Sequence, residues 1–148
     1  MRVRVRVLRA EGVDTRNYFD PPVHRQRSHA QRSPADLPVT DAVARRQPLQ
    51  GWEVDRAASS VLERAGYGAH ILHRTGHSLG AAAVHGDGVN MDDYETHDDR
   101  RLLPGTGLTI EPGLYFDDFG IRLEIDMLVR DRDAIVTGPV QSAIVTLG

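Results

Sequence analysis

Two alternating apolar segments flank a short polar turn in the second half of this chain, and this pattern most constrains its fold. GLTIEPGLYF (107–116) and GIRLEIDMLV (120–129) have the β-branched and aromatic residues of strands, with turn residues between them. A hairpin centred between Asp117 and Asp118 would pair residues whose numbers add to 235. The chain is therefore expected to build on an antiparallel sheet.

The remaining elements are one helix and several short strands. WEVDRAASSVLERAG (52–66) has apolar residues at the spacing of an amphipathic helix, and Gly66 predicts its end. Alternation or short apolar runs predict strands at RVRVRVL (2–8, an edge strand), AHILHR (69–74), DAIVTG (133–138) and SAIVTL (142–147). The prolines within residues 12–40 predict irregular chain. The fold class is α+β, with a mostly antiparallel sheet and one or two helices after an irregular N-terminal segment.

Composition excludes several classes of chemistry. The chain of 148 residues has no cysteine, which excludes disulfides and thiolate metal sites and fits a cytoplasmic protein. All 18 basic residues are arginine, so a lysine Schiff base is excluded. No apolar run approaches the roughly 20 residues that cross a membrane, and the start of the chain is not a signal peptide.

Charge is divided unevenly along the chain. Residues 1–46 hold 10 arginines and 5 acidic residues, a net charge of +5, whereas residues 47–148 carry a net charge of −8. The basic start lacks interleaved aromatic residues, so we expect a solvated face there and not nucleic-acid binding.

Three histidines and two glutamates follow one another in the second half: His73, His77, His85, Glu111 and Glu124. Imidazole and carboxylate together suit Zn, Mn, Co or Fe. The histidines lie close in sequence, next to glycines that allow close approach of the backbone. This series predicts a metal or acid–base site.

The hairpin register places Glu111 directly opposite Glu124, since their numbers add to 235. Like charges opposed in this way are destabilising, and a bound cation would turn the repulsion into a site. Pro112 lacks an N–H, and a bulge there would shift the register. The alternative is a solvent-facing stripe of Arg122, Glu124 and Asp126 in which the arginine pairs with a carboxylate.

Taken together, these motifs resemble a known enzyme family. From about Gly51 to Val129 the chain is similar to the C-terminal half of the pita-bread (creatinase/aminopeptidase-like) metallopeptidases. The similarity is carried by AHILHRTGHSLG, VHGDGVNMDDYETHDDRRLLPG, LTIEPGLYF and FGIRLEIDMLV. The branch they resemble most is Xaa-Pro aminopeptidase and prolidase. The resemblance implies a partial pita-bread fold and hydrolysis of an N-terminal peptide bond by metal-activated water.

Residue roles are implied by the same resemblance. It implies one or two divalent ions (Mn, Co or Zn), with metal ligands His77, Glu111 and Glu124, substrate-side catalytic histidines His73 and His85, and substrate binding by Arg122. The family holds its two metal ions with two further aspartates, on a hairpin upstream of the helix, and this chain has no such pair. His77 and His85 are also eight positions apart where seven are expected, so the added residue should displace His85.

The first 46 residues resemble a different family. GVDTRNYFDPPVHRQ (12–26) and DLPVTDAVARR (36–46) are similar to a C-terminal piece of the pyridoxal-phosphate sugar aminotransferases. This piece carries neither a cofactor pocket nor the catalytic lysine, so aminotransferase activity is excluded. We therefore expect a chimeric chain with an irregular or partly ordered segment at 1–50 and a metallopeptidase-like half-domain at 51–148.

These expectations support two functions. The first is a metal-dependent peptidase acting on a peptide substrate, impaired by the missing aspartates. The second is a non-catalytic or truncated descendant that serves as a binding or interaction module. Half of a pita-bread fold would leave a sheet edge and an apolar face uncovered, which predicts a homodimer or poor solubility. The lack of a long apolar run predicts no membrane partner.

Overall fold

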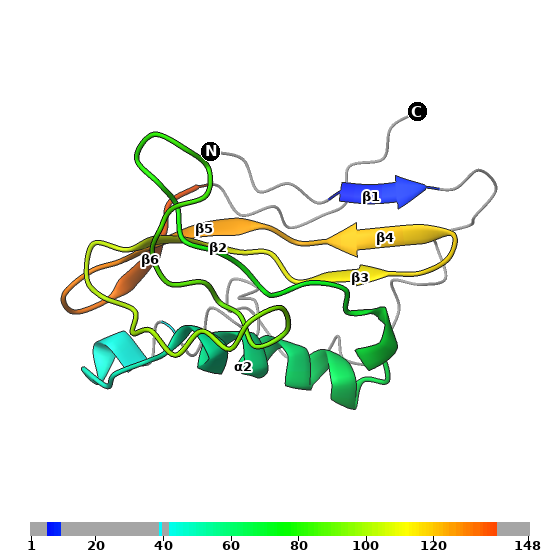
Figure 1. The fold of residues 1–148 in the computed structure, drawn as a ribbon, viewed down its shortest axis with the longest axis horizontal. Helices are drawn as coiled ribbons and strands as arrows, with labels where there is room; N and C mark the ends of the chain where they lie inside the picture. Colours follow the sequence, from blue (N-terminus) through cyan, green and yellow to red (C-terminus); the bar gives the residue numbers. More distant parts are fainter. Residues whose placement is uncertain (1–5, 10–38, 40–41, 139–148) are drawn as a thin grey trace, which may run out of the picture.

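The computed structural model describes residues 6–9, 39 and 42–138. Within these residues, six strands form two three-stranded antiparallel sheets: β1 (Arg6–Arg9), β4 (Phe119–Arg122) and β3 (Gly113–Tyr115) in one, and β2 (Gly107–Ile110), β5 (Ile125–Val129) and β6 (Ala134–Val136) in the other. Helix α2 (Gly51–Arg64) runs along one side of both sheets (Figure 1). Within the described part, no helix is long and apolar enough to cross a membrane.

The two sheets share one interrupted hairpin. β2 continues into β3 and β4 into β5, and both strands break at the same level, at residues 111–112 and 123–124. The pairs Gly113–Arg122 and Ile110–Ile125 keep one register on both sides of the break. The predicted register is confirmed, and Pro112 shifts nothing: its carbonyl accepts the Leu123 N–H at 3.2 Å.

The prediction of a strand at AHILHR is wrong. Gly68–His70 is a turn of 3₁₀ helix, η2, followed by irregular chain. Strand-like pairing begins instead at Thr75, whose carbonyl accepts the Glu111 N–H at 2.7 Å, and Leu79 closes it with an N–H bond of 2.8 Å to Gly107. A side chain at position 76 would lie 2.0 Å from the Thr109 carbonyl. The glycine there lets this segment approach the outer edge of β2.

Helix α2 confirms the amphipathic pattern. Its start is fixed by the Glu53 carboxylate, which accepts the Gln50 N–H at 2.8 Å. At its end, Gly66 has a φ of 91°, and the Tyr67 N–H bonds the Leu62 carbonyl at 2.9 Å. This is the glycine termination expected from the sequence.

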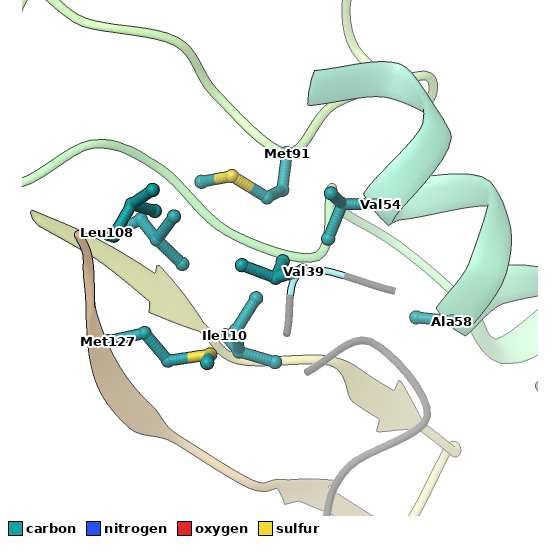
Figure 2. Close-up of a cluster of buried hydrophobic side chains, with 8 residues drawn as sticks. Val39, Val54, Ala58, Met91, Leu108, Ile110 and Met127 are labelled. Atoms are coloured by element: carbon teal, nitrogen blue, oxygen red, sulfur yellow. The ribbon is translucent and has the colours of Figure 1, made fainter. Parts of the chain in front are cut away.

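The core lies between α2 and the β2–β5 pair, as Figure 2 shows. Its largest fully buried side chains are aliphatic or methionine: Val39, Val54, Met91, Leu108, Ile110, Met127 and Val129. Each contributes roughly 1.5–3 kcal/mol of transfer free energy relative to an exposed side chain. This core holds one face of β2 against the helix, so the opposite face is left for polar residues.

The N-terminal segment takes part in the fold at two places. β1 pairs with β4 as an edge strand, Val7 opposite Ile121, as the alternation predicts. Val39 belongs to the core, and residues 42–44 are helical. The remaining parts of the aminotransferase-like segments and the SAIVTL strand lie outside the described residues, so the proposed division at residue 50 stays a prediction.

Candidate functional site

Polar side chains gather on the face of the β2–β5 pair that points away from the core. Thr109 pairs with Asp126 on β5, and on its other side its N–H bonds the His77 carbonyl at 2.8 Å. Directly opposed residues share a face of a sheet, and so do residues two apart along a strand. His77, Thr109, Glu111 and Asp126 therefore lie on one face.

His77 and Glu111 meet within this face. The His77 Nδ1 lies 2.8 Å from the Ser78 carbonyl, which can only accept, so Nδ1 carries the hydrogen. Its Nε2 then presents a lone pair, 3.4 Å from Glu111 Oε1. The His77 side chain is buried, at 8% exposure, and the Glu111 side chain is mostly covered, at 13%. Two basic atoms facing each other away from water require a cation or a proton between them.

Thr109 ties these two residues to the strand. Its hydroxyl accepts the His77 N–H at 2.9 Å and lies 3.2 Å from Glu111 Oε1. Because Thr109 is only 1% exposed, water does not compete with its hydroxyl for these hydrogen bonds. Thr109 thus holds the His77 backbone and the Glu111 carboxylate in a fixed relative position.

Arg122 joins Glu111 to a second cluster. Its Nη1 donates to Glu111 Oε2 at 3.2 Å, and its Nη2 donates to the Tyr115 hydroxyl at 2.8 Å. The Tyr115 hydroxyl lies 2.9 Å from His73 Nε2. Because His73 Nδ1 faces the Arg74 carbonyl at 2.6 Å, Nδ1 carries the hydrogen and Nε2 accepts from the tyrosine. Arg122 pairs with a carboxylate, as the alternative interpretation of this strand required.

Gly113 makes room for this cluster. A Cβ at this position would lie 2.8 Å from His73 Nε2 and 2.9 Å from the Tyr115 ring. Gly113 also stands opposite Arg122 in the hairpin. The close approach of His73 and Tyr115 therefore depends on a glycine at this point.

His85 lies beside His77 in spite of the eight-position spacing. Its ring packs edge-on against that of His77, with centroids 4.1 Å apart. The loop between them folds back through bonds from Gly86 N to the Ser78 carbonyl and from Gly80 N to the Ala83 carbonyl. His85 is exposed at the edge of the site, and its displacement relative to the family stays a prediction.

Glu124 lies at the break between β4 and β5, opposite Glu111 by the shared register, and its side chain is half-buried. Its carboxylate makes no hydrogen bond or ion pair with another described residue. In the described ranges, no three histidine, aspartate or glutamate side chains converge closely enough to hold a metal ion. The structure thus joins His77 to Glu111 and does not join Glu124 to them.

Asp126 was not among the predicted site residues. It is 7% exposed, and its Oδ1 has no hydrogen-bond partner among the described residues. Burial raises the pKa of this carboxyl, and the nearby Glu111 charge raises it further. The register could have identified it, since Asp126 opposes Thr109 just as Glu124 opposes Glu111. Asp126 also shows that this stripe is not solvent-facing throughout.

Residues 40–131, more than half of the 148, match the sequence profile of Metallopeptidase family M24. An uncharacterized peptidase of Schizosaccharomyces pombe is 37% identical over 86 residues, which cover 57% of this chain and 18% of that protein. The crystal structure of dipeptidase PepE from Mycobacterium ulcerans aligns with a TM-score of 0.59 at 30% identity, covering 74% of this chain and 28% of that one.

The prolidase from Pyrococcus horikoshii has the same fold, with a TM-score of 0.58 at 24% identity over 72% of this chain and 30% of that one. The chain thus spans between 18% and 30% of the length of these proteins, and it has part of the pita-bread fold. The match begins at residue 40, ahead of the Gly51 expected from the motifs. This chain belongs to metallopeptidase family M24.

Proposed function

We propose that the sheet face around His77 and Glu111 is the metal- and substrate-facing side of a peptidase that hydrolyses an N-terminal peptide bond, with a preference for Xaa-Pro substrates. The observation that carries the proposal is the buried contact of two basic atoms, His77 Nε2 and Glu111 Oε1, at 3.4 Å. A divalent cation would relieve their repulsion, as would a proton. M24 peptidases are metal-dependent, which favours the metal.

His77, Glu111 and Glu124 would hold a divalent ion such as Mn, Co or Zn. A neutral imidazole with its hydrogen fixed on Nδ1 offers Nε2 as a ligand, and two carboxylates balance the charge of the ion. The ion supplies a bound water of lowered pKa and a polarised substrate carbonyl. Two ligands already face each other, and Glu124 would complete the set from the opposite strand.

The second cluster would act on the substrate side. Arg122 fixes Glu111 through Oε2, which leaves Oε1 directed at His77. His73 Nε2 accepts a hydrogen bond from the Tyr115 hydroxyl, and the two side chains together would contact the reacting carbonyl group. His85, exposed beside His77, would contact substrate from the open edge.

A second candidate is a non-catalytic binding module that keeps the fold without the chemistry. It is favoured by the Arg122 guanidinium, which already neutralises part of the Glu111 charge, at 3.2 Å. It is also favoured by the lack of three converging ligand side chains in the described residues. The two candidates differ in whether the chain retains a metal ion after dialysis.

The test is metal stoichiometry. The full chain is loaded with Mn or Co, dialysed, and its metal content measured by mass spectrometry. We expect His77→Ala to abolish metal binding and Glu124→Gln to weaken it by about tenfold or more, because each removes a ligand. His97→Ala is the matched control, since His97 is exposed and stacks on Trp52 away from the site. Unchanged affinity in both site variants would overturn the assignment.

The number of bound ions per chain separates three outcomes. Two ions would mean that further carboxylates are supplied from elsewhere, and hydrolysis of Xaa-Pro peptides should be measured next. One ion would support a reduced site of His77, Glu111 and Glu124 with weak hydrolysis. No bound ion would favour the binding module.

Two further expectations remain proposals. We propose a cytoplasmic location, supported by the absence of cysteine from the sequence. We also propose a homodimer, supported by the exposed strand edges of a partial pita-bread fold. Sedimentation equilibrium of the full chain tests the second, and a monomer at micromolar concentration would contradict it.

A further inference from the structure

A groove of about 750 Å³ lies between residues 43–48, 101–104 and 129–132. The second and third segments lie just before β2 and at the end of β5, whereas Glu111 and Glu124 lie at the other end of this strand pair. Four residues of β2 separate the two places, about 13 Å of extended chain. The groove therefore shares no residue with the candidate site.

The groove is strongly basic. Arg46, Arg101, Arg130 and Arg132 line it, and among the described residues Asp131 is the only acid in the lining. Arg130 is held by the Asp133 carboxylate. Among the described residues, no carboxylate lies within ion-pair distance of the other three arginines. This concentration of positive charge stands mostly in a part of the chain, residues 47–148, whose net charge is −8.

The floor and rim of the groove are apolar. Val129 is 2% exposed, and Leu102 packs against the core beside it. Leu103, at 61% exposure, stands open to solvent on the rim next to Pro104. Apolar surface between guanidinium groups fits a ligand that carries both apolar groups and negative charges.

We propose that this groove docks an acidic peptide segment of a partner protein, one in which carboxylate side chains alternate with apolar ones. The planar guanidinium matches a carboxylate through two parallel hydrogen bonds. Alternating side chains of an extended peptide point to opposite sides, so acidic groups reach the arginines while apolar groups contact Leu102 and Leu103. The groove volume is within the usual range for ligand sites. This inference does not depend on peptidase activity.

The test uses a fluorescein-labelled octapeptide of alternating Glu and Leu and measures its anisotropy with the full chain at low and physiological salt. We expect saturable binding that the double variant Arg101→Gln/Arg132→Gln weakens by about tenfold or more, because charge-assisted bonds are lost. Arg64→Gln is the matched control, an exposed arginine in the last turn of α2, and should change affinity less than about twofold. Circular dichroism checks that each variant is folded.

Two further probes separate peptide from other occupants. A peptide of alternating Gln and Leu should bind at least about tenfold more weakly, since it keeps the shape and loses the charge. Leu103→Ser should weaken binding without unfolding the chain, because this side chain is exposed. Equal binding of the neutral peptide, tighter binding of tripolyphosphate than of the acidic peptide, or an unchanged affinity in the arginine double variant would each overturn the proposal.

Discussion

Carboxylates occupy two regions of this molecule and behave differently in them. Around the loop after the site histidines, buried aspartates are fully bonded: Asp92 Oδ1 accepts the backbone N–H groups of Tyr94, Glu95 and Thr96 at 2.8–3.1 Å. On the sheet face, Glu111 faces a lone pair and Asp126 leaves an oxygen without a partner among the described residues. The first group stabilises backbone, whereas on the sheet face Glu111 is bonded by the Arg122 and Thr109 side chains and Asp126 keeps one oxygen without a partner among the described residues.

The pKa shifts of Asp92 and Asp126 show the same division, although burial also raises the pKa of the fully bonded Asp55. Burial raises the pKa of Asp92, but the hydrogen bonds from Thr96, Glu95 and Tyr94 outweigh it and leave the pKa below its usual value. For Asp126 burial prevails, and the pKa is raised. Asp92 is thus structural, whereas Asp126, with an oxygen that lacks a partner among the described residues, is a candidate functional group.

Removing a fully bonded carboxylate should cause the largest loss of stability. Asp55 on α2 accepts the Thr75 N–H at 3.0 Å and its hydroxyl at 2.5 Å, and it accepts the Asp93 N–H at 2.7 Å. Asp55→Ala leaves these donors without partners, so we expect a loss of roughly 3 kcal/mol in the free energy of unfolding. Urea denaturation measures it. The exposed Asp99→Ala is the control, and an equal loss in both would remove the distinction between bonded and free carboxylates.

The second largest effect is expected from acid, which should weaken the hydrogen bonds that Asp98 makes in the loop after the site histidines. Hydrogen bonds from Arg100 hold the pKa of Asp98 at about 2, below its ordinary value of 3.8. Because the folded-state pKa is lowered, this stabilisation is complete above about pH 4 and is lost as the pH falls through about 2. We expect about 1–2 kcal/mol, reduced by the half-exposed Arg100 side chain. Denaturation between about pH 5 and 2 should show this slope, and Asp98→Asn should remove it.

On the sheet face, replacing a carboxylate should raise the free energy of unfolding. Asp126→Asn keeps the shape and removes a buried charge whose Oδ1 has no partner among the described residues, so the chain should gain about 1 kcal/mol. The exposed Asp87→Asn is the matched control and should change stability by less than about 0.5 kcal/mol. A loss of stability on replacing Asp126 would show that this carboxylate is bonded like those of the loop.

The hairpin was predictable because a single turn fixes the whole register. Once Asp117 and Asp118 form the turn, Glu111 must oppose Glu124, and the structure keeps this register on both sides of the strand breaks. Helix α2 was predictable for a similar reason, since its periodicity and Gly66 are local signals.

The partners of the site residues were not predictable from local patterns. Tyr115 reaches His73 across 42 positions, and Asp55 reaches Thr75 across 20, so neither contact leaves a periodic signal. The strand expected at AHILHR failed because its apolar residues indicated pairing, whereas Gly76 determines where the backbone can approach β2. Asp126 and Thr109 could have been found by extending the register argument beyond the two glutamates.

The smallest loss of stability should come from removing the Tyr115 hydroxyl, which contacts both Arg122 and His73. Tyr115→Phe removes the acceptor for Arg122 Nη2 at 2.8 Å and the donor to His73 at 2.9 Å, and it leaves the ring in place. We expect a loss of about 0.5–1 kcal/mol in stability, because these groups are only partly buried. Tyr94→Phe, at an exposed tyrosine, should have no effect. In a double-mutant cycle with Arg122→Gln, a coupling energy of about 0.5 kcal/mol or more would show that the tyrosine holds the arginine. If the stability losses of the two single variants simply add, the Tyr115 hydroxyl does not orient Arg122. The contact between the His77–Glu111 pair and the His73–Tyr115 pair would then contribute nothing to stability.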